Sequence, residues 1–374
     1  MTPRIAIIAD DLTGALDTSS PFAAHGMTVA VAVGLEGIYE ALDAHPAVIA
    51  VNTASRDLTA EQAASRAARA ARMLLSGGRP DIVFKKIDSR LKGNIGRETE
   101  MVARVFGYTH AVVAPAVPDQ ERFTIAGTVV GRGASAALAI APFFAGQPFT
   151  ADIRDAGSDA DLDQIAADYR GQWDRTLAVG ARGLGGALAR SMGASAAVSA
   201  PVSALASAPV NAPCTIEPAA ALFAFGSTDP ITLGQMEALR PWVSVIEAPE
   251  GHLPEPAAAR LPLLTRITGA GGDTADAVAR RFAKGIARYI AVCRPSGLVM
   301  GGGDTALAIL QELGARVLYP AGEAAPGLPA FDIGQSCGKR LRCVAKSGGF
   351  GSRDVLAGLL RAEAHAGAVN VIAD

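Results

Sequence analysis

Two adjacent carboxylates follow the first strand-like run of the chain, and they are the first residues that could do chemistry. Asp10 and Asp11 come directly after the apolar run Arg4–Ala9. Carboxylates at the carboxyl end of a strand can bind sugar hydroxyls, hold Mg²⁺ or act as a general base. The alternative is structural, because Asp11 or Thr13 could cap the helix that the sequence predicts over Thr13–His25.

A second and a third polar segment also follow strand-like runs. Arg56 ends the segment Asn52-Thr53-Ala54-Ser55-Arg56, and its planar guanidinium suits a carboxylate, although it could also be a surface side chain. Lys85–Gly96 is the densest polar segment of the chain. Three such segments, each placed after a buried-type strand, favour a binding site over three separate solvated loops. In the third segment, the candidate substrate-binding residues are Lys86, Asp88 and Ser89.

Neighbouring lysines in this third segment should not share one role. Side chains alternate between the two faces of a strand, so Lys85 and Lys86 should point in opposite directions if the strand extends over both. We therefore expect one of the two lysines to face the site. Gly93 and Gly96 lie near a helix start, where backbone N–H groups favour an anion.

Small-residue loops follow three strand-like runs in the second half of the chain. They are Gly226–Thr228, Gly301–Thr305 and Ser347–Gly351. Glycine exposes backbone N–H groups and a helix start adds partial positive charge, so such loops can bind phosphate. None is a Walker A loop, and none has the GxGxxG pattern of dinucleotide-binding folds. The candidate nucleotide-binding residues are Ser227, Gly302, Gly303, Asp304, Thr305, Gly348 and Gly349.

The elements that must position these residues alternate along the chain between β-branched runs and Ala-rich helical stretches. This alternation predicts an α/β fold with two domains, each a mainly parallel sheet flanked by helices. Thr59 should cap a helix that runs to Leu75. Residues 194–213 consist of Ala, Ser and Pro with almost no charge, which predicts a linker. We therefore expect an N-terminal domain over 1–213 and a C-terminal domain over 214–374.

Composition excludes several classes of protein. The chain has 34 Lys and Arg residues against 36 Asp and Glu residues, so it has no excess of positive charge that would indicate binding to nucleic acid. Its longest apolar runs are too short to cross a bilayer, and no signal-peptide pattern precedes Ile5–Ala9, so we expect a cytoplasmic protein. The four cysteines form no CxxC pair, which indicates reduced structural residues. The five histidines lack zinc-site spacing, so a metal would be bound by oxygen, through ligands that remain unknown.

Eight segments together carry a resemblance to a known family. In chain order they are IADDLTGA (Ile8–Ala15), NTASR (Asn52–Arg56), KKIDSRLKGNIGRE (Lys85–Glu98), PAVP (Pro115–Pro118), GSTDPITLGQ (Gly226–Gln235), GGGDTA (Gly301–Ala306), PGLP (Pro326–Pro329) and KSGGFG (Lys346–Gly351). With these segments the chain resembles the four-carbon acid sugar kinase family, which includes 3-oxo-tetronate, D-threonate and D-erythronate kinases. The segments occur in the family's order and cover nearly the whole chain.

The resemblance implies an N-terminal acid-sugar-binding domain and a C-terminal nucleotide-binding domain. It implies ATP as donor, Mg²⁺, and transfer of phosphate to the terminal hydroxyl of a small four-carbon sugar acid. The candidates of the first half would then bind the acid, and those of the second half would bind ATP. Asp10 or Asp11 is expected to be the catalytic base, and the protein could be a homodimer.

Two stretches depart from the family's pattern. Within Asp119–Thr124, Phe123 separates an Arg and a Thr that are usually adjacent. Thr228-Asp229 replaces the usual Cys-Ser. An acid beside a triphosphate would repel it unless a cation lies between them. These departures support one alternative, a weak or inactive ligand-sensing member of the same fold. A nicotinamide-dependent dehydrogenase is a second alternative, and the missing GxGxxG pattern speaks against it.

Overall fold

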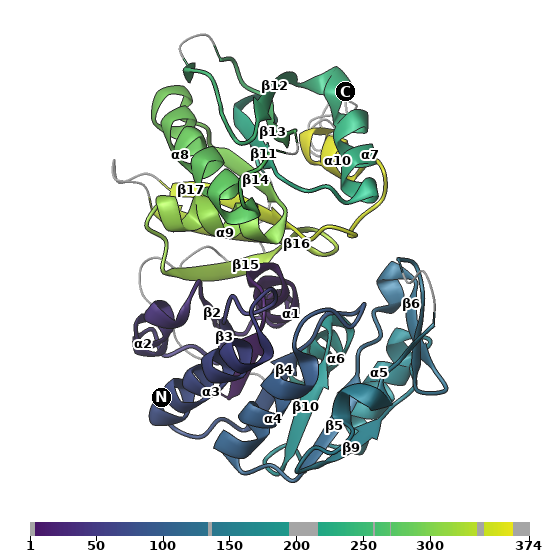
Figure 1. Ribbon diagram of the computed structural model, residues 1–374. Helices are drawn as coiled ribbons and strands as arrows, with labels where there is room; N and C mark the ends of the chain where they lie inside the picture. The colour runs from purple at the N-terminus through teal and green to yellow at the C-terminus, as the bar shows by residue number, and fades with distance from the viewer. Residues whose placement is uncertain are drawn as a thin grey trace, which may run out of the picture. The chain divides into compact units, whose positions relative to one another are not determined.

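The computed structural model describes residues 4–133, 137–193, 216–256, 259–269, 271–334 and 340–361. The chain forms two compact units. Unit 1 comprises Met1–Val210 and Arg316–Pro320, and unit 2 comprises Asn211–Ala315 and Ala321–Asp374. The linker predicted over 194–213 lies outside the described residues, as do Cys214 and Cys337, whereas Cys293 and Cys343 are free thiols. The predicted α/β class is confirmed, because both units contain mainly parallel strands and flanking helices (Figure 1).

Unit 1 is built on a mainly parallel sheet in which β1 and β4 are central. The order is β15-β2-β3-β1-β4-β10-β5-β9, and all pairs from β2 to β9 are parallel. The start of β15, at Val317 and Leu318, pairs antiparallel with β2. The strands are β1 (Ile5–Ala9), β2 (Val29–Ala32), β3 (Val48–Asn52), β4 (Ile82–Lys86), β5 (His110–Ala114), β9 (Thr150–Ile153), β10 (Thr176–Gly180) and β15 (Val317–Ala325).

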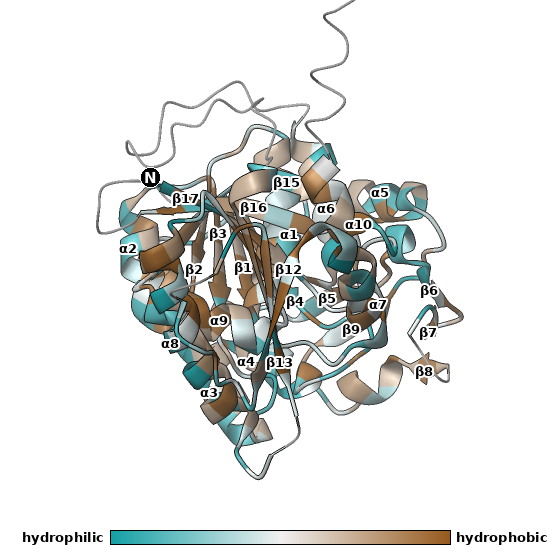
Figure 2. Cartoon of the chain, turned by 90° about the horizontal axis from the view of Figure 1, so that it is seen from above, coloured by the Kyte–Doolittle hydropathy of each residue, from teal (hydrophilic) through white to brown (hydrophobic). Residues whose placement is uncertain are grey.

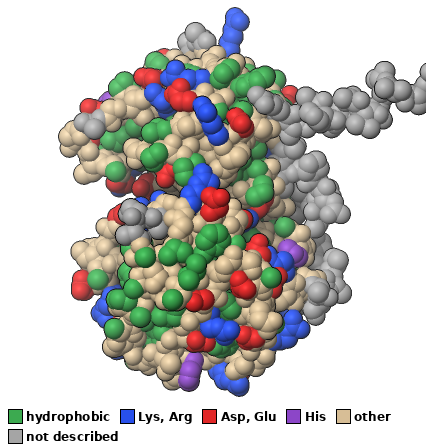
Figure 3. Space-filling model, turned by 90° about the vertical axis from the view of Figure 1, so that its right-hand side faces the viewer, with side chains coloured by type: hydrophobic (Ala, Val, Ile, Leu, Met, Phe, Trp, Pro, Cys, Tyr) green, Lys and Arg blue, Asp and Glu red, His purple; other side chains and the backbone are tan. Residues whose placement is uncertain are grey.

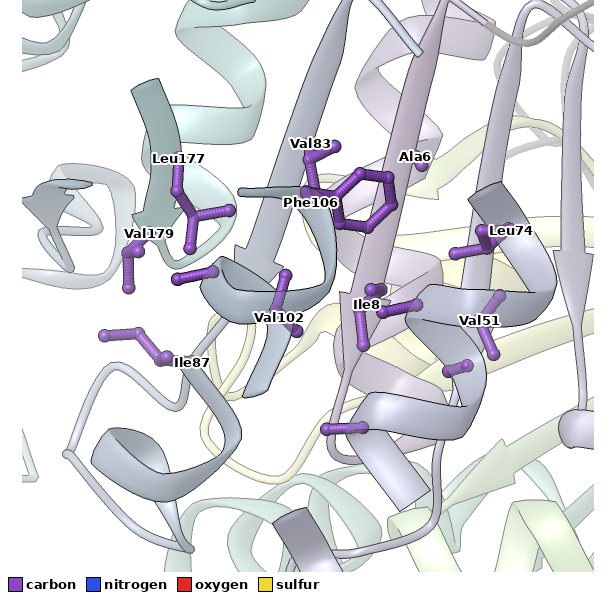
Figure 4. Close-up of a cluster of buried hydrophobic side chains, with 14 of the residues drawn as sticks. Ala6, Ile8, Val51, Leu74, Val83, Ile87, Val102, Phe106, Leu177 and Val179 are labelled. Atoms are coloured by element: carbon purple, nitrogen blue, oxygen red, sulfur yellow. The ribbon is translucent and has the colours of Figure 1, made fainter. Parts of the chain in front are cut away.

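Helices cover both faces of this sheet, as expected for a parallel sheet. One layer contains α3 and α4, which pack on each other, and the other contains α1 and α6 (Figure 1). Figure 4 shows side chains of α3 and α4, such as Leu74 and Phe106, above Ile8 and Val83 of the sheet. The helices of unit 1 are α1 (Leu12–Ala24), α2 (Ile38–Asp43), α3 (Ala60–Ser76), α4 (Ile95–Phe106), α5 (Asp159–Asp168) and α6 (Arg182–Gly193), with the 3-10 helices η1 (Leu35–Gly37), η2 (Pro118–Gln120) and η3 (Ala141–Phe144).

A small antiparallel sheet follows β5 in unit 1. Its order is β6-β7-β8, and Arg122 of β6 lies opposite Gly131 of β7. Arg122 and Thr124 are two residues apart, so they share one face of β6, and both are buried. The strands of this sheet are β6 (Arg122–Ile125), β7 (Thr128–Gly131) and β8 (Leu138–Ala139).

Unit 2 repeats the same layered plan. Strands β12, β13, β11, β14 and β17 are parallel in that order, and β16 runs antiparallel to β17. Helices α7 and α10 pack together over Phe223 and Phe225, and α8 packs on α9. The elements are β11 (Ala221–Phe225), β12 (Ser244–Pro249), β13 (Leu263–Thr268), β14 (Gly297–Gly301), β16 (Leu328–Gly334), β17 (Arg340–Lys346), α7 (Pro230–Leu239), α8 (Ala275–Cys293), α9 (Gly303–Glu312), α10 (Val355–Arg361), η4 (Pro218–Ala220) and η5 (Arg240–Trp242).

Local sequence signals account for several element boundaries. Thr59 caps α3 as predicted, and Gln62 completes a capping box with it. The hydropathy colouring of Figure 2 shows central strands that are hydrophobic along their length, as burial on both faces requires. On the face shown in Figure 3, side chains of both charges are interspersed. Among the helices that the structure describes, none is both long and apolar enough to cross a membrane.

Candidate active site

The polar segments of unit 1 meet at the carboxyl ends of three neighbouring parallel strands. Ala9 at the end of β1 lies opposite Asn52 at the end of β3 and opposite Lys86 at the end of β4. The residues that follow these strand ends therefore lie side by side. The backbone N–H of Ser55 donates to the carbonyl of Asp10 at 2.9 Å, which joins the first two loops directly.

Arg56 binds both adjacent carboxylates. Its Nε and Nη2 donate to the two oxygens of Asp10 at 2.7 and 3.0 Å, and its Nη1 donates to Asp11 Oδ2 at 3.0 Å. Nη2 also lies 3.0 Å from Asp11 Oδ1 and 3.8 Å from Asp88 Oδ2. The guanidinium thus directs its N–H groups at protein carboxylates, and this arrangement makes Arg56 a residue that positions Asp10 and Asp11. Its predicted contact with a substrate carboxylate stays a prediction.

Asp10 is a buried carboxylate that remains ionised because of its neighbours. Burial by itself would raise the pKa of Asp10, but the charge and hydrogen bonds of Arg56, with the charges of Lys85 and Lys86, lower it below 3.8. Asp10 is therefore charged at neutral pH.

Gly93 allows the third loop to approach Asp10 and Arg56, since it has a φ of +86° and an added Cβ would lie 3.0 Å from Asp10 Oδ2.

Asp11 has a structural role that does not exclude a chemical one. It is the N-cap of α1, where its Oδ1 accepts from the backbone N–H of Gly14 at 3.0 Å. Its Oδ2 accepts from the hydroxyl of Thr13 at 2.6 Å. An added Cβ at Gly14 would lie 2.4 Å from Asp11 Oδ1 and 2.6 Å from Lys86 Nζ. Only glycine at this position leaves room for the ammonium of Lys86 beside the carboxylate of Asp11.

The two lysines at the end of β4 have different environments. Lys85 Nζ lies 2.9 Å from Glu98 Oε2 in a fully buried pair, and Glu98 Oε1 accepts from the hydroxyl of Ser55 at 2.6 Å. Lys86 instead lies against Gly14, next to the carboxylates of α1. The two side chains therefore point to opposite faces of β4, and Lys86 is the one that lies beside Asp11. Its contact with a substrate stays a prediction.

Asp17 is a site residue that the sequence analysis did not single out. It lies one turn after Gly14 in α1, and it is buried near Lys86, Asp11 and Arg182. Burial raises the pKa of Asp17 to about 7, although Lys86 and Arg182 partly offset this effect. Burial lowers the pKa of Lys86, but the charges of Asp17, Asp11 and Asp10 outweigh it and raise that pKa above 10.5. Lys86 is therefore an ammonium at neutral pH.

Asp88 and Ser89 connect this cluster to the small sheet. Asp88 Oδ1 accepts from the backbone N–H of Arg90 at 2.8 Å, while its other oxygen faces Arg56. The hydroxyl of Ser89 accepts a hydrogen bond from Arg122 Nη1 at 2.7 Å. The structure thus brings the predicted residues of unit 1 into one region, and it adds Arg122, which the sequence analysis mentioned only as a departure from a pattern.

The small-residue loops of unit 2 also meet at the carboxyl ends of neighbouring strands, which are β11, β14 and β17. An added Cβ at Gly226 would lie 2.1 Å from Thr305 Oγ1, and one at Gly302 would lie 3.4 Å from Ser227 N, so the first two loops are in contact. Gly302, with a φ of +95°, is the N-cap of α9 and provides no side-chain cap. The N–H groups of Gly303–Thr305 therefore suit an anion.

Lys346 holds the third loop, which contains Gly348 and Gly349. Its Nζ donates to Thr232 Oγ1 at 3.0 Å, to the carbonyl of Ser347 at 3.1 Å and to the carbonyl of Gly348 at 2.9 Å. Burial lowers the pKa of Lys346 to about 8. The predicted nucleotide-binding residues thus lie on three loops of unit 2, and their roles stay predictions.

Magnesium would fit this unit without a dedicated protein cage. Within the described residues, no group of three or more His, Cys, Asp or Glu side chains forms a metal site. Magnesium is commonly bound by one or two carboxylates together with substrate phosphates and water. Asp304, an exposed carboxylate in the first turn of α9, suits that donor set.

Two family models match different parts of the chain. A family model described as a sugar-binding N-terminal domain matches residues 5–151, and one described as a nucleotide-binding C-terminal domain matches residues 273–356. The chain is 32% identical to a D-threonate kinase of Bordetella bronchiseptica, over 95% of this chain and 96% of that protein. The chain belongs to the four-carbon acid sugar kinase family.

Other proteins are also similar over nearly the whole chain. A 3-oxo-tetronate kinase of Methylobacterium radiotolerans is 27% identical, over 95% of this chain and 98% of that protein. A solved structure from Salmonella typhimurium LT2 matches with a TM-score of 0.72 at 16% identity, over 96% of this chain and 99% of that chain. A Haemophilus influenzae protein matches with a TM-score of 0.63 at 18% identity, with the same coverage. The two structures support the fold.

The structure gives one departure from the family's pattern a physical reason. Asp229 is the N-cap of α7, where its Oδ1 accepts from the backbone N–H groups of Ile231 and Thr232 at 3.0 and 3.4 Å. Asp and Ser are both favoured N-cap residues, so Asp229 can start this helix as the usual Ser would. The substitution therefore has a structural explanation that does not require a loss of catalysis.

Proposed function

We propose that this protein is an ATP-dependent kinase that phosphorylates the terminal hydroxyl of a four-carbon sugar acid, such as threonate, erythronate or 3-oxo-tetronate. Its similarity to the D-threonate kinase over 95% of the chain carries this proposal. The polar cluster at the strand ends of unit 1 supports it, because adjacent carboxylates beside a guanidinium and an ammonium can bind a polyhydroxy acid.

In this proposal the residues of unit 1 bind and activate the acid. Asp10 or Asp11 accepts the proton of the terminal hydroxyl, and Arg56 holds both carboxylates in place. Lys86 remains an ammonium beside them and stabilises the negative charge that develops on the attacking oxygen. Phosphoryl transfer depends mainly on such positioning and charge neutralisation.

The residues of unit 2 bind ATP in this proposal. The backbone N–H groups at the start of α9 and the loop held by Lys346 receive the phosphates. Asp304 would hold Mg²⁺ together with the phosphate oxygens, and the ion would neutralise charge on the transferred group when bound. The cytoplasmic location and the homodimer stay predictions.

The test is ADP release with Mg²⁺-ATP against D- and L-threonate, D- and L-erythronate, 3-oxo-tetronate and 4-hydroxy-threonine. We expect rapid ADP release with at least one of these acids and little without acid. Binding of ATP without ADP release across the whole panel would contradict the proposed kinase and would favour the ligand-sensing alternative.

A further inference from the structure

A buried group of hydrogen-bond donors lies next to the proposed acid site of unit 1. It consists of Gln120, Arg122, Thr124 and Ser89, all of which are at most 8% exposed. Arg122 Nη1 donates to Ser89 Oγ at 2.7 Å and to Gln120 Oε1 at 2.8 Å, and Arg122 Nε donates to the carbonyl of Arg132 at 2.9 Å. We call these four side chains the Arg122 cluster.

Two donors of the Arg122 cluster need a partner. Gln120 Nε2 and Thr124 Oγ1 are buried and have no hydrogen-bond partner among the described residues. The hydroxyl of Ser89 accepts from Arg122, so its own hydrogen points elsewhere. Buried polar groups are nearly always hydrogen-bonded, because leaving one without a partner is unfavourable. Such a set of donors suits a ligand that has only acceptors.

Positive charge is concentrated at the same place. An added Cβ at Gly133 would lie 3.6 Å from Arg122 Nη2 and 3.6 Å from Arg90 Nη1, so both guanidinium groups border one space. Asp119, an acid that interacts with Arg122, is bound to Arg182 Nε at 3.3 Å. Two guanidinium groups with amide and hydroxyl donors form a typical carboxylate site.

The cluster around Arg56 has the opposite character. There, Asp10, Asp11 and Asp88 surround one guanidinium, with Lys86 beside them. A substrate carboxylate would be repelled by these three acids, whereas a hydroxyl can donate to them. An acid sugar with a hydroxyl at one end and a carboxylate at the other therefore has a preferred direction in unit 1.

Consecutive residues connect the two clusters. The carboxylate of Asp88 lies 3.8 Å from Arg56 Nη2, and the hydroxyl of Ser89 lies 2.7 Å from Arg122 Nη1. Because consecutive Cα atoms are about 3.8 Å apart, the two clusters are anchored on adjacent backbone positions. We propose that the Arg122 cluster binds the carboxylate of the acid substrate and so selects acids over neutral polyols. This inference rests on the proposed kinase function.

The experiment compares kcat/KM for the best four-carbon acid with kcat/KM for the matching polyol, in which CH₂OH replaces the carboxylate. The main variant is Gln120→Glu, which keeps the side-chain shape but replaces the Nε2 donors by a negative oxygen. A second variant is Arg122→Gln. The matched control is Gln62→Glu on the exposed start of α3, where Glu can also serve in the capping box.

We expect the acid-to-polyol ratio to fall at least tenfold in Gln120→Glu and in Arg122→Gln, mainly through a higher KM for the acid. KM for ATP should not change, and the control should behave like wild type. A purely structural role would lower acid and polyol turnover together and leave the ratio unchanged, which would overturn the inference while the kinase function stands. No turnover of any acid by the wild type would instead overturn the proposed function, and the inference with it.

Discussion

Replacing Arg56 by Met should expose how strongly unit 1 depends on its charge cluster. The variant keeps the apolar stem of the side chain and removes its charge and its hydrogen bonds to Asp10 and Asp11. Breaking a buried ion pair on one side costs about 3–5 kcal/mol, because the remaining charge is left without a partner. Since the Arg56 side chain is 24% exposed, we expect the lower end of that range.

This loss should appear as a clear shift in thermal unfolding. A destabilisation of about 3 kcal/mol corresponds to a fall in Tm of roughly 6–12 °C for a unit of this size. The matched control is Arg4→Met, which removes an exposed arginine that lies 3.6 Å from Asp81 in the same unit. Exposed pairs of this kind contribute about 0–1 kcal/mol, so the control should unfold close to the wild type.

The pH dependence of this difference gives a stricter test. In the wild type, the pKa of Asp10 lies below 3.8, so its ion pair stabilises the fold at neutral pH and is lost only as the pH falls below about 4. Without Arg56, the largest effect that opposes burial is lost, only the charges of Lys85 and Lys86 still oppose it, and the pKa of Asp10 rises. The carboxylate of the variant is then most costly at neutral pH and is protonated as the pH falls.

We therefore expect the difference in Tm between wild type and Arg56→Met to be larger at pH 7.5 than at pH 5. Adding Asp10→Asn to the variant should restore part of the lost stability, because it removes the unpaired charge. A difference in Tm that is independent of pH, with no recovery in the double variant, would refute the reasoning.

Three further predictions test unit 2. Asp304→Ala should raise KM for ATP or abolish turnover while acid binding, measured by calorimetry, is unchanged; normal ATP kinetics would remove Asp304 from the site. Asp229→Ala should cost about 1 kcal/mol of stability through loss of an N-cap, whereas Asp229→Ser should unfold like the wild type. Between pH 7.5 and 10.5, the free energy of unfolding of the wild type should rise by up to roughly 3 kcal/mol relative to that of Lys346→Met. The reason is that the pKa of Lys346 is about 8 in the folded protein and 10.5 in the unfolded chain, so the folded protein loses this proton at a lower pH. Urea unfolding at several pH values measures this gain, and a constant difference would contradict it.

Local patterns were sufficient to predict the parts of the site that lie at strand ends. Asp10, Arg56 and Lys86 each follow or end a strand, and parallel pairing brings the three strand ends to one level. A turn residue after an apolar run is a local signal, and the rule for parallel sheets then supplies the long-range contact. The cap at Thr59 could be predicted for a similar reason, since a capping box spans only four residues.

Contacts that depend on distant pairing could not be predicted in this way. Arg122 reaches Ser89 across 33 residues, from a short strand in which the polar residues Arg122 and Thr124 are buried. This is the reverse of the usual alternation, which would bury the apolar residues of the strand. Glu98 and Asp17 lie in helices, where a charged residue ordinarily faces solvent, yet both are buried because Lys85 and Lys86 lie against those helices. Only the assembled layers show that these charges are inside.

The buried carboxyl of Asp17 adjusts the charge of the candidate acid site. Arg56 and Lys86 bring two positive charges to this cluster, where the carboxylates of Asp10, Asp11 and Asp88 already outnumber them before Asp17 is counted. Because burial raises the pKa of Asp17 to about 7, this carboxyl is protonated below neutral pH and ionised above it. Ionised Asp17 also competes for the charge of Lys86, which leaves less of it for an oxygen that becomes negative during phosphoryl transfer. Within the part of the chain that the structure describes, Asp17 makes no hydrogen bond to a predicted substrate-binding residue. Its charge can nevertheless influence how well this cluster accepts an anion.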